Sequence, residues 1–87
     1  MLFDSAECRL VGFTLAPGQA VPVHTSASSV IVTVISGDGV FTGAESERAL
    51  RAGESLHYDP NEPHGMTAGA GGLQFLALIT PGPGAPK

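Results

Sequence analysis

The most hydrophobic segment of the chain is residues 30–35, where five β-branched aliphatic residues and one threonine follow one another without a break. Such a run is typical of a strand covered on both faces, so we expect it at the centre of a sheet. Shorter segments alternate between apolar and polar residues, as half-buried strands do, and together these patterns predict an all-β sandwich or barrel. The other predicted strands are residues 8–15, 21–25, 40–42, 54–58 and 73–80.

Turn-forming residues separate the predicted strands. Gly-Asp-Gly at residues 37–39 predicts a hairpin, and the small residues at 68–72 predict a turn. Two prolines within residues 59–63 predict a loop, because proline cannot donate a hydrogen bond to a strand ladder. For residues 46–50 a helical turn and a strand are both compatible with the sequence, and a strand suits a meander better.

The length of the chain, 87 residues, gives room for one domain. We expect this domain to span residues 1–80 and to be followed by a flexible tail rich in proline and glycine, residues 81–87. A domain of this size is close to the lower limit for a self-sufficient core. Only 14% of the residues are charged and 43% are hydrophobic, so we expect a homodimer that covers apolar surface.

Charge and composition exclude several classes of partner. The formal net charge is −4 and no Lys/Arg cluster is present, so nucleic acid is not an expected partner. No segment approaches the ~20 apolar residues of a membrane span, so we expect no membrane partner. Cys8 is the single cysteine, which excludes an intramolecular disulfide and a multi-cysteine zinc site and fits a cytoplasmic location.

His24 lies in a segment bounded by glycines. Five residues separate Gly18 from His24, Ser26 follows after one residue, Val30 after three more, and Gly37 after a further six. This spacing resembles the first motif of the cupin family, Gly-x5-His-x-His-x3-Glu-x6-Gly. Ser26 occupies the second His position of that motif, and Val30 occupies the Glu position.

His64 lies in a second segment of this kind. From Gly53 the chain runs through Asp59 and Asn61 to His64, which resembles the second cupin motif, Gly-x5-Pro-x-Gly-x2-His-x3-Asn. Asp59 stands in the Pro position, Asn61 in the second Gly position, and Ala68 in the final Asn position. The resemblance therefore covers residues 18–68, more than half of the chain.

The resemblance implies a small single-domain cupin, a double-stranded β-helix (jelly-roll) barrel, with a degenerate metal motif. Cupins generally bind a divalent ion such as Mn, Fe, Ni or Zn inside the barrel, through two His and a Glu of the first motif and a His of the second. Only His24 and His64 match these ligands, so they are the candidate metal ligands. Two imidazoles without a carboxylate would hold a first-row ion loosely, and Cu or Ni would compete best for them.

Strand alternation sorts the side chains near this pair. Ser26 and Ser28 share the parity of His24 and are suited to hydrogen-bonding a small ligand or a water molecule. His57 has the opposite parity to Tyr58, so it points away from the barrel interior if Tyr58 points into it. The predicted ligand pocket consists of His24, Ser26, Ser28, Tyr58 and His64.

Structural roles compete with these assignments. His24 and His64 are equally compatible with two interior histidines that hydrogen-bond to backbone or water. Tyr58 and Phe75 fit an apolar pocket wall, but core packing explains them as well, and Met66 fits a role as core filler.

Three functions remain open at this point. The first is a cupin that binds a small polar molecule with weak or no metal dependence, favoured because two of the four usual metal ligands are missing. The second is a metal-dependent enzyme of the dioxygenase, isomerase or lyase type with a reduced two-His site. The third is an interaction module whose interior is filled by side chains. Whether the protein is an enzyme is not decided by the sequence, because the fold supports many chemistries.

Overall fold

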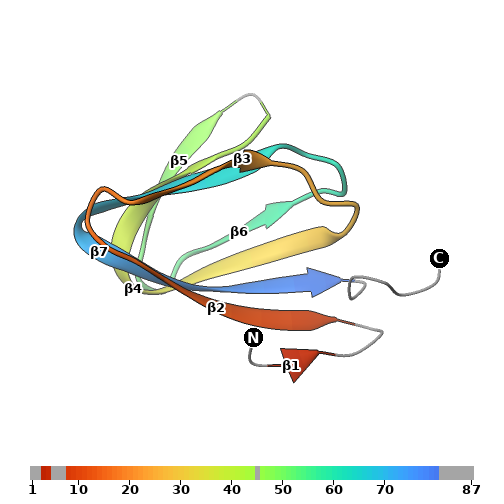
Figure 1. Ribbon diagram of the computed structural model, residues 1–87, viewed down its shortest axis with the longest axis horizontal. Helices are drawn as coiled ribbons and strands as arrows, with labels where there is room; N and C mark the ends of the chain where they lie inside the picture. The colour runs from red at the N-terminus through yellow and green to blue at the C-terminus, as the bar shows by residue number, and fades with distance from the viewer. Residues whose placement is uncertain (1–2, 5–7, 45, 81–87) are drawn as a thin grey trace.

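The computed structural model describes residues 3–4, 8–44 and 46–80, and within these ranges the regular structure is entirely β (Figure 1). All paired strands run antiparallel, which confirms the predicted all-β class. The predicted tail, residues 81–87, lies outside the described residues. The strands are β1 (Phe3–Asp4), β2 (Arg9–Leu15), β3 (Ala20–His24), β4 (Ser29–Thr42), β5 (Glu47–Arg51), β6 (Ser55–Tyr58) and β7 (His64–Thr80).

The two long strands, β4 and β7, pair with each other over most of their length and bend together, as Figure 1 shows on one side of the molecule. Their two halves belong to different layers. Residues 73–80 of β7 and 29–37 of β4 lie in a first layer, in the order β1-β2-β7-β4-β6. Residues 64–68 of β7 and 39–42 of β4 lie in a second layer, in the order β3-β7-β4-β5. The result is a sandwich of two sheets joined at a shared bend.

The hairpin predicted at residues 37–39 and the turn predicted at 68–72 are both wrong, because β4 and β7 continue through them. Gly37 has a φ of 76°, a conformation open to glycine, and the pairing register shifts on both sides of it. Opposite this point, residues 69–72 of β7 face Asp38 alone, since Gly39 pairs with Ala68 and Gly37 with Leu73. The glycines therefore bend two paired strands instead of reversing the chain.

The core lies between the two layers. Alternate residues of the central strand β4, Val30, Val32 and Val34, point inward and are at least 95% buried, while Ile31 and Ile35 point outward. Residues 30–33 of β4 are paired with β6 on one side and with β7 on the other, so the prediction of a central strand is confirmed. The strand predicted at residues 46–50 is also present, as β5. The core residues are Leu15, Val30, Val32, Val34, Phe41, Leu50, Tyr58, Met66, Ala68, Leu73, Phe75 and Ala77.

Candidate functional site

His24 and His64 lie side by side in the second layer. His24 is the last residue of β3, His64 is the first residue of β7, and the two are direct partners in the antiparallel register. Their ring centroids are 4.2 Å apart with an interplanar angle of 64°. His64 is only 6% exposed, whereas His24 is exposed. The pair therefore connects the interior of the sandwich with its surface.

Both imidazoles are oriented in the same way by the backbone. Nδ1 of His24 lies 2.9 Å from the carbonyl oxygen of Pro22, and Nδ1 of His64 lies 3.1 Å from that of Glu62. A carbonyl oxygen only accepts hydrogen bonds, so in each neutral ring the proton is on Nδ1 and donates to it. Nε2 of each ring then keeps its lone pair, and no hydrogen bond from a described residue engages it. Each histidine can therefore accept a hydrogen bond or ligate a metal ion through Nε2.

A cavity of about 310 Å³ lies between the two layers beside these rings. The first layer contributes residues of β2, β4 and the second half of β7, and the second layer contributes residues of β3 and the first half of β7. Among the described residues, the two imidazoles are the only nitrogen- or oxygen-bearing side chains in its lining. The lining consists of Phe13, Val21, His24, Val30, Val32, His64, Met66, Phe75, Ala77 and Ile79.

The structure separates the predicted pocket residues. His24 and His64 line the cavity, but Ser26, Ser28 and Tyr58 are not in its lining. The Oγ of Ser26 accepts a hydrogen bond from the backbone N–H of Ser28 at 3.1 Å, so this hydroxyl is used within the turn between β3 and β4. Val30, in the Glu position of the first motif, does project into the cavity.

Asn61, at a glycine position of the second motif, holds the loop before His64 in place. Asn61, which stands where the motif has glycine, has a φ of 65° and is the one non-glycine residue with positive φ among the described residues. Asparagine tolerates this conformation better than most residues. Its N–H donates to the carbonyl oxygen of Ser26 at 2.6 Å, which ties the loop to the turn that follows His24. Asn61 thus adopts a positive φ at the position where the motif has glycine, although it carries a side chain.

Tyr58 supports His64 from outside the cavity. Its ring centroid is 4.9 Å from that of His64, and its hydroxyl donates a hydrogen bond of 3.0 Å to the carbonyl oxygen of Thr42. Because β6 lies in the first layer and residue 42 of β4 in the second, this bond links the two sheets. Burial, with a further contribution from the negative charge of Glu62, raises the pKa of Tyr58 to about 12.

Titration of Tyr58 gives a test of this buried environment. Tyr58 is the only tyrosine, so ultraviolet absorbance of tyrosinate should report a pKa near 12 in the folded protein, against 10.0 for an exposed phenol. Between these values the folded state binds more protons than the unfolded state, so stability present below pH 10 should be lost as the pH rises towards 12. Tyr58→Phe should remove this loss and lower stability at neutral pH by about 1 kcal/mol. A midpoint near 10 in native protein would contradict the assignment.

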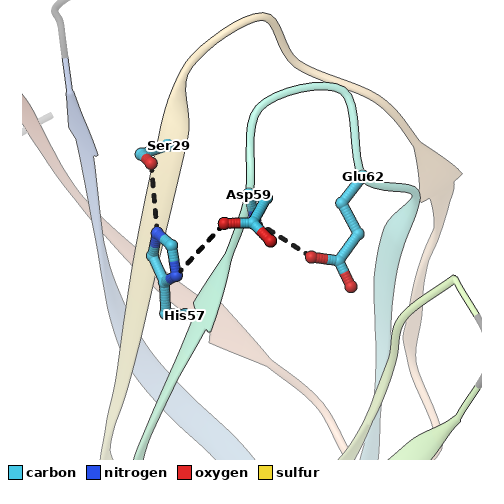
Figure 2. A network of polar contacts seen from close by, with 4 residues as sticks. All are labelled: Ser29, His57, Asp59 and Glu62. Carbon is cyan, nitrogen blue, oxygen red and sulfur yellow. Dashed lines mark hydrogen bonds and ion pairs between the residues drawn. The ribbon is translucent and has the colours of Figure 1, made fainter.

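His57 lies on the outer face of the first layer, as its parity predicts, and its side chain is 51% exposed (Figure 2). Its Nε2 is 3.0 Å from the hydroxyl of Ser29, and its Nδ1 is 3.7 Å from the carboxylate of Asp59. A Ser-His-Asp series resembles a hydrolase triad, but here the His–Asp distance exceeds a hydrogen bond and both side chains are in solvent. None of the three lines the cavity, so this network lies at the surface and is separate from the candidate site.

The divalent ion implied by the fold family does not fit this site well. Among residues 3–4, 8–44 and 46–80, no three His, Cys, Asp or Glu side chains come together as a metal-binding group. Val30 supplies no oxygen where the motif has a carboxylate. Glu62 is directed elsewhere, because its Oε1 accepts the backbone N–H of Asp59 at 2.9 Å. Two imidazoles are the nitrogen ligands that the cavity offers.

Comparison with protein families identifies the class. The family model of the cupin domain matches residues 12–79, which is most of the chain, so the chain belongs to the cupin family. A search of curated proteins gave no match. The described part of the chain contains no helix that is long and apolar enough to cross a membrane.

Solved structures support the same fold. A protein from Klebsiella pneumoniae with a double-stranded β-helix domain has a TM-score of 0.88 at 24% identity, covering 98% of this chain and 76% of that chain. An RmlC-like cupin from Desulfovibrio desulfuricans has a TM-score of 0.84 at 28% identity, with 92% and 77% covered. A predicted oxalate decarboxylase from Thermotoga maritima has a TM-score of 0.79 at 27% identity, with 85% and 67% covered. These structures support the double-stranded β-helix (jelly-roll) fold of this chain.

Proposed function

We propose that this cupin binds a small molecule with an apolar body and one hydrogen-bond donor, and that binding does not depend on a metal ion. The observation that supports this most is the cavity of about 310 Å³, whose lining is apolar except for two imidazoles with open Nε2 atoms. Its volume is at the small end of ligand pockets, which are about 300–1,000 Å³. The sequence alone favoured a small polar molecule, and the lining shifts this proposal towards a ligand with a larger apolar part.

The cavity favours such a ligand for two reasons. Each methylene group that leaves water for an apolar wall contributes about 0.8 kcal/mol, and Phe13 and Phe75, stacked at 4.8 Å, offer aromatic surface. A ligand hydroxyl, or a carboxylic acid bound in its protonated form, would donate to Nε2 of His24 or His64. A sugar would leave several hydroxyl groups in the cavity without partners, which costs free energy for each group. Phenols and short aromatic acids are therefore the proposed ligand class.

The alternative is a metal-dependent enzyme with a reduced two-His site. One observation favours it: metal-ligating histidines commonly donate their other N–H to a backbone carbonyl, as both rings do here. Beyond the two imidazoles, which this alternative uses as metal ligands, the described residues that line the cavity offer no acid–base group. The hydroxyl of Tyr58 is engaged by Thr42, the carboxylate of Glu62 by Asp59, and neither side chain lines the cavity. Binding is therefore the better-supported function.

The test is a thermal-shift and calorimetric panel of phenols, benzoic acids and monosaccharides, run in the presence and absence of a chelator. We expect phenols or benzoic acids to raise the melting temperature equally with and without the chelator, and monosaccharides to have no effect. Stabilisation that disappears with the chelator would favour the metal-dependent alternative. Stabilisation by sugars alone would overturn the proposed ligand class.

The histidine pair should account for the polar part of this affinity. Replacing by alanine the histidine that accepts from the ligand, His64 or His24, should weaken binding of the best ligand about tenfold, which corresponds to about 1.4 kcal/mol. His57→Ala is the matched control, because it removes an imidazole from the outer face and should leave the affinity unchanged. Isothermal titration calorimetry measures all three, and equal losses would contradict the assignment.

We also propose a homodimer in the cytoplasm. Ile31 and Ile35, 40% and 52% exposed, share the outer face of the first layer, and Ile31 pairs there with Leu78. An apolar face of this kind is suited to a second copy of the chain. The single thiol, Cys8, fits a reducing compartment. Light scattering that gives the mass of a monomer, or recovery outside the cytosolic fraction, would overturn the respective proposal.

A further inference from the structure

Met66 adds a third donor atom to the histidine pair. It lies two residues after His64 in β7, so both side chains project from the same face of the strand. Across the strand pair, Met66 is opposite Val21 and His64 is opposite His24. Met66 is 6% exposed and lines the same cavity as both imidazoles. The cavity thus presents two imidazole nitrogens and one thioether sulfur from neighbouring positions.

The softness of this donor set selects among metal ions. Thioether sulfur suits Cu(I) and Zn²⁺, and imidazole suits Cu, Zn, Fe and Ni, whereas carboxylate, carbonyl and water oxygens suit Mg²⁺, Ca²⁺ and Mn²⁺. The donor set therefore disfavours the hard ions, and the choice between Cu(I) and Zn²⁺ depends on charge. The cavity lacks a carboxylate, because valine stands at position 30 and Glu62 is held by Asp59. The donor set therefore keeps two imidazoles of the cupin motif, lacks its carboxylate and adds a thioether sulfur.

The charge of the ion leads to the same selection. Burying an ion in an apolar cavity carries a desolvation cost that rises with the square of its charge. His24, His64 and Met66 are neutral ligands, so a divalent ion would keep both of its charges in the cavity, whereas Cu(I) would keep one. We propose that these three residues form a binding site for Cu(I) that discriminates against divalent ions.

This inference uses the same cavity as the proposed function but does not rest on it. Organic ligands are tested with a chelator and without copper, whereas the copper site is tested without organic ligand. Cu(I) binding with no response to phenols or aromatic acids would overturn the proposed function alone. A response to organic ligands with no Cu(I) binding would overturn this inference alone.

The experiment is an anaerobic Cu(I) titration against a chromogenic Cu(I) chelator, with parallel Zn²⁺ and Mn²⁺ titrations. All variants carry Cys8→Ser, because a thiol is itself a Cu(I) ligand and Cys8 is the only one in the chain. We expect one equivalent of Cu(I), bound more tightly than Zn²⁺ or Mn²⁺. Met66→Leu, which is similar in shape, should weaken Cu(I) at least about tenfold, the lower end of what supporting residues contribute to metal sites. It should leave the weak Zn²⁺ binding unchanged, and as an exchange of similar volume in the core it should lower the melting temperature only slightly.

X-ray absorption of the copper-loaded protein gives a readout specific to the sulfur. A sulfur scatterer should be present in the Cys8→Ser protein and absent after Met66→Leu is added. His64→Ala should reduce both Cu(I) and Zn²⁺ binding. Unchanged Cu(I) affinity in Met66→Leu, a sulfur scatterer that persists in it, or Zn²⁺ bound as tightly as Cu(I) would each overturn the inference.

Discussion

Val30→Glu should convert the cavity into a site for divalent ions, raising its affinity for Mn²⁺, Ni²⁺ or Zn²⁺ about a hundredfold, which corresponds to about 2.7 kcal/mol. Val30 is 5% exposed and lines the cavity together with His24 and His64, so a carboxylate at this position faces the same cavity as the two imidazoles. Two unit charges about 4 Å apart attract by about 4 kcal/mol at the dielectric constant typical of a protein surface. Part of this attraction between the carboxylate and the ion offsets their desolvation, and the rest strengthens binding. Calorimetric titration of each ion measures the change.

The same substitution should destabilise the protein when no metal is present, because an ionised carboxylate without a partner is costly in an apolar cavity. An ion at about a hundred times its dissociation constant should then restore about 2.7 kcal/mol, or roughly 10–20 °C in the melting temperature of a domain of this size. Val30→Gln is the matched control: it has nearly the same shape as the glutamate and no charge, and metal should not rescue it. Equal metal affinity in the two variants would show that the side chain at position 30 does not reach the site.

Much of the frame of this site could be predicted from sequence. The uninterrupted run at residues 30–35 identifies the central strand, which pairs with β6 and β7 on its two sides. The cover that the run predicts for both faces is present on the inner face only, because Ile31 and Ile35 are 40% and 52% exposed. The spacing of the two motifs predicts that His24 and His64 lie near each other, and the structure pairs them directly. Parity alone places His57 on the outer face.

The bends were not predictable from local sequence. Gly-Asp-Gly at residues 37–39 has the composition of a reversing turn, and whether the chain reverses or bends depends on a partner strand that bends at the same place. The ligand surface was missed for a related reason. The walls of the cavity come from four strands. Met66 belongs to the core, as the sequence predicts, and it also lines the cavity because it follows His64 at the strand period of two. Ser26 shares the parity of His24, but the backbone N–H of Ser28 engages its hydroxyl, which is a contact that parity does not reveal.

Gly37→Ala should destabilise the protein by about 4 kcal/mol or more, at the upper end of single substitutions, because two costs act at one atom. The φ of 76° is strained for any residue with a Cβ, at about 1–2 kcal/mol. In addition, a Cβ at this position would overlap the carbonyl oxygen of Gly72 and crowd Cα of Leu73. These are backbone atoms of the strand that bends together with β4, so relieving the overlap requires the two layers to move apart. Urea denaturation of wild type and variant measures the difference.

Two other glycines separate these costs and keep the prediction testable if Gly37→Ala fails to fold. Gly53 has a φ of 90°, and a Cβ added there would meet no atom within 4 Å, so Gly53→Ala should show the conformational cost alone, about 1–2 kcal/mol. Gly71 has open space and no positive φ, so Gly71→Ala should stay within about 0.5 kcal/mol of wild type. Similar losses in Gly37→Ala and Gly53→Ala would mean that the close approach of β4 and β7 does not limit the bend, and that the corner of the sandwich tolerates side chains as a surface turn does.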